Sequence, residues 1–397
     1  MIAKSRYNNN YIGPKALFDP NYIPPKLLYR KKDEDSLFSI LNDSISDEFC
    51  LNILFQGIQG VGKKAIINTV TRNILNQNKE ESNIQTISID CKEKKTDELI
   101  ITLLSEMNKF LNLNLNFETV INSKISHLWS MLKLASNRLD INLILIFNNI
   151  EYLKPEIFKK FLRLGKEINT TIISTINKLL RPITLDMLNE FDFKKNLSYF
   201  SYKELYYILK QRASLTFLHE IDAELLEFII DLIFEHYIPV PGKGVDILRE
   251  LYPFLKNQKS VGHFEMMEVC KNQFDTFQPS DEFNMLNYIS EEDILTILFL
   301  DNLSNYFLKK SNFYISYNGL KELYNISCET LRYEKDTNEF NDLIKKAQNV
   351  GILSFSKKNF DKKDNHVSNN ALFGDYYFMI INPNDLKIMV DAVFGKI

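Results

Sequence analysis

The decisive stretch of the sequence reads Gly57-Ile58-Gln59-Gly60-Val61-Gly62-Lys63-Lys64. It follows a short apolar run, residues 51–56, that predicts a strand, and it precedes residues 65–70, which predict a helix. A strand, a glycine-rich loop and a helix in this order bind the phosphates of a nucleotide, because backbone N–H groups and the helix N-terminus face the anion. We therefore predict a nucleotide site made by the loop and the first helical turn, with the residues Gly57, Gly60, Gly62, Lys63, Lys64 and Ala65.

The residue after the loop lysine is unusual. Lys63 is placed to reach the outer phosphates, but the next position, where a Ser or Thr hydroxyl normally binds Mg²⁺, holds Lys64. One interpretation is that the Lys64 ammonium stands near the metal position, so that a nucleotide is held without Mg²⁺ and is hydrolysed slowly or not at all. The others are that Lys64 points to solvent in a site that has lost nucleotide binding, or that ordinary binding persists weakly.

A second departure lies at the end of the strongest predicted strand. Residues 141–147 are almost all apolar, which is typical of a central parallel strand covered on both faces. A hydrolase usually carries an acidic pair at this strand end, but this chain carries Asn148 and Asn149. An amide ligates Mg²⁺ more weakly than a carboxylate and cannot act as a general base near pH 7. Asn148 and Asn149 are therefore either degenerate catalytic positions or a plain polar strand end, and Glu151 is expected in the following loop or helix.

The first 200 residues predict an α/β domain. Apolar runs alternate with segments of helical periodicity, and this alternation is typical of a parallel sheet flanked by helices. The predicted strands are 51–56, 84–89, 141–147 and 170–175, and the predicted helices are 31–41, 65–70, 99–111, 125–139 and 158–168. The carboxyl ends of parallel strands meet at one edge of a sheet, so we expect the nucleotide in a crevice there.

The rest of the chain predicts two further domains. Residues 201–287 indicate a small helical domain, with helices at 202–217, 222–236, 245–252 and 263–274 and a polar linker from 279. Residues 288–397 combine predicted helices at 289–308, 317–324 and 338–350 with predicted strands at 352–356 and 376–381. Helices followed by a β-hairpin with a basic tip have the outline of a winged helix-turn-helix.

Composition limits the function. The 397 residues are 45% hydrophobic, so sizeable cores can form, and the net charge is −3, so nucleic-acid binding must rest on local basic surface. The four cysteines and five histidines show no metal-ligand spacing, which argues against a zinc site and for reduced thiols. The N-terminus lacks an apolar signal region, and no stretch approaches the roughly 20 apolar residues of a membrane span. We expect an intracellular, cytoplasmic protein with no membrane partner and no dedicated metal site.

Basic residues cluster in the last domain, although acids slightly outnumber bases there as a whole. The candidate DNA-binding residues are Lys345 and Lys346 on the predicted recognition helix and Lys357, Lys358, Lys362 and Lys363 on the predicted wing. Asn338, Glu339 and Asn341 are placed to contact base edges, whereas the charges of Glu339 and Asp342 oppose phosphate. The alternatives are a solvated hairpin beside an ordinary surface helix, or a winged helix that binds protein.

Several segments, taken in order, resemble the archaeal replication initiators of the origin-recognition type, which are AAA+ proteins. Residues 18–30, a proline-containing stretch that ends in Arg30, are similar to the family's lead-in. The glycine loop resembles the Walker A motif with Lys64 in place of Thr. Residues 147–151 resemble the Walker B motif, in which Leu-Asp-Glu-Ile-Asp is usual.

The resemblance continues through the rest of the chain. Residues 173–177 are similar to the sensor-1 strand, and Asn177 matches its polar residue. Residues 200–213 resemble the start of the lid, and residues 246–249 resemble the end of the sensor-2 segment. Two expected arginines are missing, since residues 185–188 offer no arginine finger and the sensor-2 position falls on Gly242; Arg181 and Arg249 are the alternative arginines.

The resemblance implies an AAA+ core with its lead-in at 1–200, a helical lid at 201–287 and a winged-helix domain at 288–397. It implies ATP or ADP as the ligand, with Arg30 among the nucleotide-binding residues. Lys64 and the strand-end amides argue against the usual dependence on Mg²⁺. The resemblance also implies double-stranded DNA as a partner, an active AAA+ paralogue or a replicative helicase as a protein partner, and association with the nucleoid. We therefore predict a DNA-binding, initiator-like protein with a degenerate nucleotide site. The alternatives are an active ATPase with an unusual site and a regulatory paralogue that binds protein rather than DNA.

Overall fold

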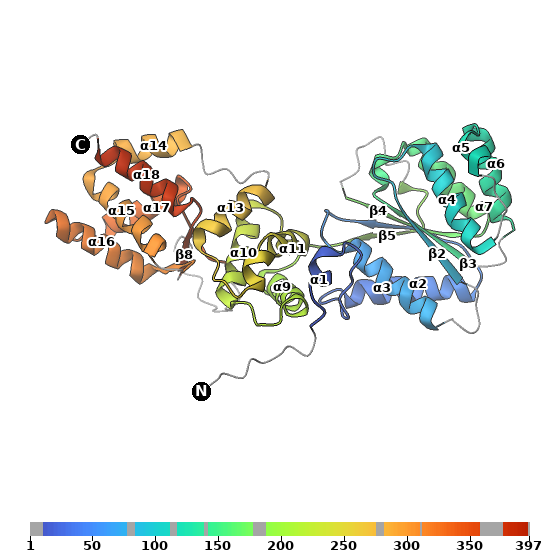
Figure 1. Cartoon of the computed structure of the whole chain (residues 1–397), viewed down its shortest axis with the longest axis horizontal. Helices are drawn as coiled ribbons and strands as arrows, with labels where there is room; N and C mark the ends of the chain where they lie inside the picture. Colours follow the sequence, from blue (N-terminus) through green and yellow to red (C-terminus); the bar gives the residue numbers. More distant parts are fainter. Residues whose placement is uncertain are drawn as a thin grey trace. The chain divides into compact units, whose positions relative to one another are not determined.

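The structure, a computed structural model, describes residues 11–77, 84–111, 117–138, 142–177, 188–274, 282–309, 312–357 and 376–395. Its contacts divide the chain into two units (Figure 1). The core unit is Ile23–Tyr199, and the C-terminal unit is Met1–Tyr22 together with Phe200–Ile397. None of the helices in the described ranges combines the length and the apolarity that crossing a membrane requires.

The core unit is built on a five-stranded parallel sheet in the order β2-β3-β4-β1-β5. Its strands are β1 (Asn52–Gln56), β2 (Ile84–Asp90), β3 (Asn142–Asn148), β4 (Thr171–Ile176) and β5 (Phe193–Asn196). Strands β3 and β4 are buried almost throughout because both of their faces are covered, as their apolar sequences predict. The edge strand β5 was not predicted, since Lys194 and Lys195 give it no apolar pattern.

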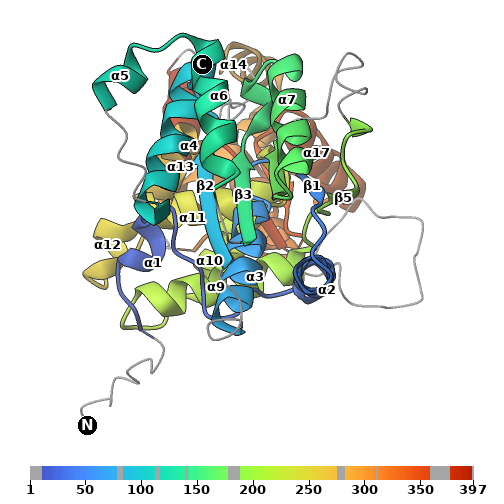
Figure 2. The same ribbon diagram turned by 90° about the vertical axis from the view of Figure 1, so that its right-hand side faces the viewer.

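Helices cover both faces of this sheet. The helices are α2 (Lys31–Ser46), α3 (Lys63–Gln77), α4 (Thr96–Leu111), α5 (Phe117–Ile121), α6 (Ile125–Ser136) and α7 (Pro155–Glu167), with a single 3₁₀ turn η1 (Ile150–Tyr152). Helices α2 and α3 lie on one face, and α4, α6 and α7 lie on the other (Figure 1, Figure 2). On the second face Phe161 of α7 packs on Phe147 of β3 and on Trp129 of α6, with ring centroids 5.2 and 4.6 Å away.

The first part of the C-terminal unit is helical, as predicted. It consists of α1 (Lys15–Phe18), α9 (Tyr202–Thr216), α10 (Ala223–His236), α11 (Pro241–Glu250), α12 (Tyr252–Lys256) and α13 (His263–Gln273). Helix α9 begins at a reciprocal capping box of Ser201 and Glu204, which satisfies two otherwise unpaired N–H groups. The described residues before Ile23 also belong here, and Arg249 donates two hydrogen bonds to the carbonyl of Leu17 at 3.0 and 3.2 Å.

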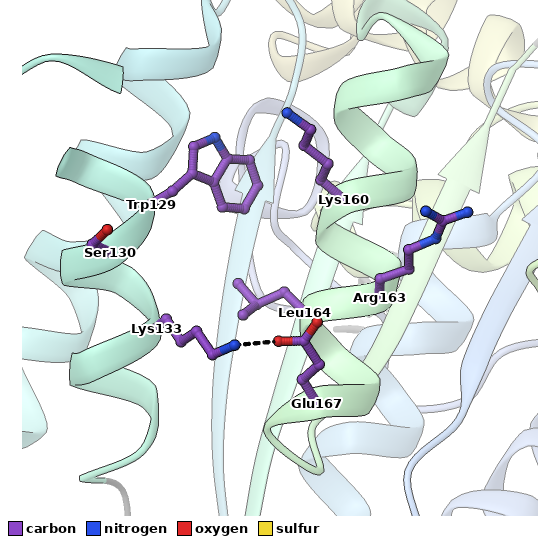
Figure 3. Close-up of a pocket in the computed structure, with 7 residues that line it drawn as sticks. All are labelled: Trp129, Ser130, Lys133, Lys160, Arg163, Leu164 and Glu167. Carbon is purple, nitrogen blue, oxygen red and sulfur yellow. Dashed lines mark hydrogen bonds and ion pairs between the residues drawn. The ribbon is translucent and has the colours of Figure 1, made fainter. Parts of the chain in front are cut away.

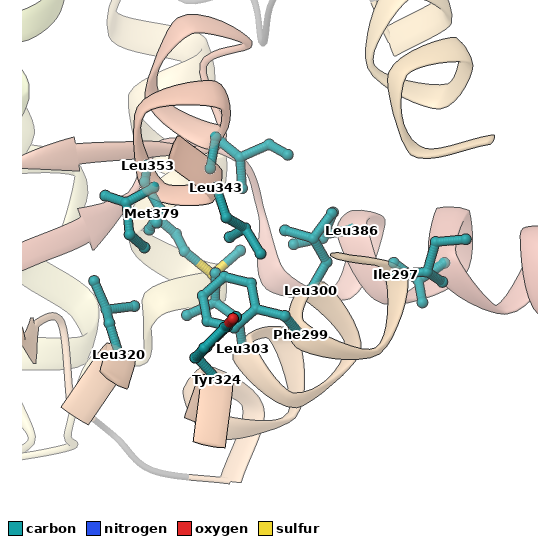
Figure 4. Close-up of a cluster of buried hydrophobic side chains, with 14 of the residues drawn as sticks. Ile297, Phe299, Leu300, Leu303, Leu320, Tyr324, Leu343, Leu353, Met379 and Leu386 are labelled. Carbon is teal, nitrogen blue, oxygen red and sulfur yellow. The ribbon is translucent and has the colours of Figure 1, made fainter. Parts of the chain in front are cut away.

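The second part of the C-terminal unit contains α14 (Glu282–Glu291), α15 (Ile294–Lys309), β6 (Ile315–Ser316), α16 (Tyr317–Leu331), α17 (Thr337–Asn349), β7 (Leu353–Phe355), β8 (Tyr376–Met379) and α18 (Pro383–Phe394). The strands form an antiparallel sheet in the order β6-β8-β7. Helices α15 to α18 and this sheet enclose an apolar cluster that includes Phe299, Leu343 and Met379 (Figure 4). This is the predicted winged helix-turn-helix arrangement.

Several details differ from the sequence prediction of this part. Strand β6 was not predicted, and α16, predicted at 317–324, continues to Leu331. The single helix expected at 289–308 is two helices, because the Asp293 carboxylate accepts a hydrogen bond from the Thr296 N–H at 2.8 Å and starts α15 afresh. Helix α18 was not predicted; it starts at Pro383, directly after the capping residue Asn382.

The two parts of the C-terminal unit meet at a buried carboxylate. Asp231 of α10 is only 2% exposed. It accepts hydrogen bonds from the Tyr314 hydroxyl at 2.6 Å, from the Ser356 hydroxyl at 2.7 Å and from the Lys357 N–H at 2.9 Å. The end of β7 is therefore fastened to a helix of the preceding part.

Candidate functional site

The glycine loop has the geometry of a phosphate cradle. Gly60 and Gly62 adopt φ values of 85° and 104°, which only glycine reaches without strain. Helix α3 then begins at Lys63, so its first N–H groups point toward the loop. The half-exposed Ala65 lies in this first helical turn. The predicted loop residues are thus brought together at the carboxyl end of β1.

The loop lysine is buried and lies over the loop. Lys63 is 5% exposed, and its ammonium donates to the carbonyls of Gly57 and Ile58 at 2.5 and 3.0 Å. Burial lowers the pKa of Lys63 to about 8, an effect that the charge of Glu151 opposes and that of Lys64 reinforces. This cation is therefore poorly solvated and gains most from a phosphate anion.

Lys64 is not free in solvent. Its ammonium forms an ion pair with the Asp90 carboxylate at 2.8 Å, although both side chains remain about half exposed (50% and 44%). Burial raises the pKa of Asp90, but hydrogen bonds from Lys64, Asn149 and the Lys92 N–H outweigh it and keep the pKa below its ordinary value. Asp90 ends β2, the neighbour of β3, which explains how an acid outside the predicted motifs reaches the site.

A chain of hydrogen bonds joins the ends of β2, β3 and β4 to the turn η1 and to the first turn of α3. The Asn149 amide donates to Asp90 at 2.7 Å, and its oxygen accepts from the Asn177 amide at 2.6 Å. The Asn177 amide also donates to the Glu151 carboxylate at 2.8 Å. The resulting network, Lys64–Asp90–Asn149–Asn177–Glu151, lies beside the glycine loop at the carboxyl ends of the strands.

The two strand-end amides differ in role. Asn148 is 6% exposed and is held inside the sheet, where its amide donates to the Ser88 hydroxyl at 3.2 Å and its oxygen accepts from Thr175 at 3.3 Å. Asn149 instead occupies the left-handed region at φ 60°, a conformation that Asn tolerates well, and reaches the network described above. Asn149 is thus the member of the pair at the site.

The Arg30 side chain contacts the backbone of the glycine loop. Its buried guanidinium donates to the carbonyl of Val61 at 3.2 Å and to that of Ser198 at 2.7 Å, and it pairs with Asp33 at 3.5 Å. These contacts connect the start of α2 to the loop. Arg30 therefore holds the backbone of the loop in this structure.

The residues present fit a nucleotide phosphate better than a tightly bound Mg²⁺. Mg²⁺ prefers several oxygen ligands in octahedral geometry, with carboxylates contributing most. Asp90 has both oxygens engaged, by Lys64 and by Asn149, and no hydroxyl stands at position 64. Within the described ranges, no three His, Cys, Asp or Glu side chains gather in a way that could hold a metal ion.

Sequence reasoning missed Asp90 and the role of Glu151. Both signals were present: Asp90 directly follows the predicted strand 84–89, and Glu151 follows Asn149 by two residues. Asp90 lies outside the motifs, and Glu151 stands at the last position of the Walker B-like segment 147–151, but the turn η1 that brings Glu151 back to Asn177 has no sequence signature.

The predicted DNA-binding residues lie in different settings. Lys345 and Lys346 are on α17, where they pair with Asp342 at 3.6 Å and with Glu292 at 3.3 Å. Lys357 lies at the end of β7, with its ammonium 3.4 Å from the Phe234 carbonyl of α10. Lys358, Lys362 and Lys363 lie outside the described residues, as does Arg181.

Two residues expected to contact bases are tied to the neighbouring helix. The Tyr317 hydroxyl donates to the Asn341 side-chain oxygen at 2.8 Å, and the Tyr324 hydroxyl donates to the Glu339 carboxylate at 3.0 Å. The tyrosines hold α17 against α16, so these contacts stabilise the helix pair. Asn338 is exposed at the start of α17.

A shallow groove lies elsewhere on the core unit, between α6 and α7 (Figure 3). Trp129 and Lys160 face each other across it, and Lys133 pairs with Glu167 at 2.6 Å along its edge. None of the loop or network residues lines it.

Comparison with known proteins identifies the fold. No protein-family model and no curated protein sequence matches the chain. Among solved structures, Cdc6p from Pyrobaculum aerophilum is similar with a TM-score of 0.72 at 15% identity, covering 96% of this chain and 98% of that one. The ORC1 protein of Aeropyrum pernix in complex with DNA is similar with a TM-score of 0.55 at 16% identity, covering 97% and 98%.

A third similar structure is the Aeropyrum pernix ORC2 protein, solved as ADPNP–ADP complexes, with a TM-score of 0.54 at 14% identity and coverage of 97% and 98%. These likenesses extend over nearly the whole length of each protein. The predicted resemblance is therefore confirmed for the fold: the chain has the AAA+, lid and winged-helix fold of the Cdc6 and ORC origin-recognition proteins.

Proposed function

We propose that this chain is a replication-initiator-like AAA+ protein that binds ATP or ADP at the glycine loop without depending on Mg²⁺ and hydrolyses the triphosphate slowly. The observation that carries the proposal is the Lys64–Asp90 ion pair of 2.8 Å beside the loop. It supports the view that an ammonium belonging to the chain stands in the region that a metal ion serves in ordinary hydrolases.

The charges around the loop favour a polyphosphate. Lys63 and Lys64 supply two cations, and the α3 N-terminus adds a partial positive charge. Lys64 is half exposed and held by a single acid, so it can exchange Asp90 for a phosphate oxygen at little cost. The amides of Asn148 and Asn149 carry no charge, so they neither repel the nucleotide nor bind a metal ion strongly. The Lys64 ammonium is then the cation that balances the phosphate charge.

Equilibrium binding of ATP with and without EDTA tests this proposal. We expect wild-type affinity to change less than about twofold on removal of divalent metal. Lys64→Thr is expected to bind more weakly in EDTA than in Mg²⁺, because it replaces the ammonium with the usual metal-binding hydroxyl. Lys31→Thr is the matched control, since Lys31 is an exposed lysine in an ion pair of the same unit. A loss of tenfold or more in wild-type affinity with EDTA would contradict the proposal.

We further propose that the winged-helix part binds duplex DNA, in association with an active AAA+ paralogue or a replicative helicase. The support is the fold, which is shared with an ORC1 protein solved in complex with DNA, and the exposed Lys346 of α17. Mobility shifts at increasing salt should show that a Lys345→Ala/Lys346→Ala variant binds more weakly with a shallower salt dependence. Removing the four wing lysines, Lys357, Lys358, Lys362 and Lys363, tests the predicted wing in the same assay.

A protein-binding winged helix is the second candidate. It is favoured by the acids that pair with the lysines of α17, because Asp342 of the same helix pairs with Lys345 and Glu292, which follows α14, pairs with Lys346. If wild-type protein shows no affinity for duplex DNA even at low salt, this second function replaces the first.

A further inference from the structure

One carboxylate oxygen of Glu151 accepts no hydrogen bond from the other residues of the site. Its Oε1 atom accepts hydrogen bonds from the Asn177 backbone N–H at 3.3 Å and from the Asn177 amide at 2.8 Å. Its Oε2 atom is buried and makes no hydrogen bond to any of the described residues. Buried polar atoms in native proteins are nearly always paired with protein or water, so this oxygen is a candidate acceptor for a water molecule.

The charge of Glu151 acts on the glycine loop. Among the effects on Lys63, the charge of Glu151 is the one that opposes burial and keeps the lysine protonated. The two groups therefore lie close enough to interact across the site. The hydrogen bonds described above also connect Glu151, through Asn177 and Asn149, to Asp90, which pairs with Lys64 in the first turn of α3.

Asn177 fixes the direction of this carboxylate. Its amide nitrogen donates at once to Glu151 at 2.8 Å and to the Asn149 oxygen at 2.6 Å, so its rotation is prevented from two sides. Asp90 differs from Glu151, because in this structure Lys64 donates to its Oδ2 atom and Asn149 and the Lys92 N–H donate to its Oδ1 atom. Of these two network acids, Glu151 is the one with a buried oxygen that accepts no hydrogen bond from the described residues.

We propose that Glu151 is the general base of this site, in place of the strand-end acid that Asn149 cannot supply, with Asn177 as its positioning residue. The inference rests on the proposed function, namely that a nucleoside triphosphate binds at the loop. A water molecule donates a hydrogen bond to Oε2 and attacks the γ-phosphorus. A bond forms between the water oxygen and phosphorus, the bond from phosphorus to the β–γ bridging oxygen breaks, and its electron pair leaves with the diphosphate. The water proton passes to Oε2 and then to solvent.

Full-length protein carrying Glu151→Gln tests the role, with ATP affinity and single-turnover ATP hydrolysis measured separately. The amide keeps an oxygen to accept from Asn177 but cannot take a proton. We expect the hydrolysis rate to fall about 100-fold, as for loss of a general base, while ATP affinity stays within about threefold. Glu156→Gln, which removes an exposed acid from the start of α7, is the matched control and should leave both quantities unchanged.

Glu151→Asp distinguishes chemistry from folding. It keeps the carboxylate on a shorter side chain and should retain a measurable part of the rate that Glu151→Gln loses. An unchanged rate in Glu151→Gln would overturn the inference. Loss of ATP affinity in both variants would also overturn it, because that result indicates a structural role for Glu151. A third contrary result is a wild-type hydrolysis rate no higher than that of Lys63→Ala although wild-type protein binds ATP. Failure of wild-type protein to bind ATP would instead refute the proposed function itself.

Discussion

Restoring an acid at the strand end should damage this site. In Asn149→Glu, the side chain that now donates to Asp90 at 2.7 Å becomes a second carboxylate facing the first. The lost hydrogen bond to a half-exposed acid costs about 1 kcal/mol, and the left-handed conformation at φ 60° costs a non-Asn residue at least ~1 kcal/mol. Repulsion between the carboxylates adds on the order of 1 kcal/mol, discounted for the exposure of Asp90.

The total of roughly 3 kcal/mol is measurable by differential scanning calorimetry. At ~2–4 °C per kcal/mol for a unit of this size, the transition of the core unit should move down by about 6–12 °C. Adding Asp90→Asn should recover part of this shift, because the new amide can donate to the introduced carboxylate, whereas Asp90→Asn alone should destabilise. The reasoning is refuted if Asn149→Glu moves the transition by less than about 2 °C, or if it accelerates ATP hydrolysis tenfold without destabilising the protein.

Three further expectations concern single side chains. The pKa of Lys63 lies at about 8 in the free protein, and a bound phosphate favours the charged form of this lysine. ATP binding should therefore take up a proton above pH 8, and ATP affinity should weaken as the pH rises from 7 to 9.5. Calorimetric titration in buffers of different ionisation enthalpy would show both effects. Asp231→Ala removes the acceptor of three hydrogen bonds and should destabilise the C-terminal unit by about 3–5 kcal/mol, with Asp231→Asn less severe; an equilibrium urea titration showing under 1 kcal/mol for the alanine variant would contradict this. Arg30→Met removes the bonds to the Val61 and Ser198 carbonyls and should weaken ATP affinity several-fold, while an unchanged dissociation constant would show that the loop keeps its shape without them.

The frame of the candidate site could be predicted from the sequence because its signals are local. The Gly60 and Gly62 spacing, the apolar run of β3 and the polar residue after β4 are each recognisable within a few residues. Parallel topology then places their ends together without further information. The same holds for α16 and α17, whose apolar periodicity predicts a packed helix pair.

The network could not be predicted because its links are between residues far apart in the chain. Asp90 reaches Lys64 only because β2 lies beside β3, and strand order has no local signature. The sequence marks Lys64 as unusual, but its partner Asp90 depends on that strand order. Strand β5 could not be predicted either, because its sequence is polar and it forms a strand by pairing with β1.

The single tryptophan gives the core unit a built-in optical reporter. Trp129 is the one tryptophan among the 397 residues, and it packs against Phe161 beneath the groove between α6 and α7. Indole emission therefore originates wholly in the core unit, while the tyrosines of α16 and β8 belong to the other unit. Unlabelled protein can thus reveal, in one titration, whether an added nucleotide or DNA alters the environment of α6 and α7.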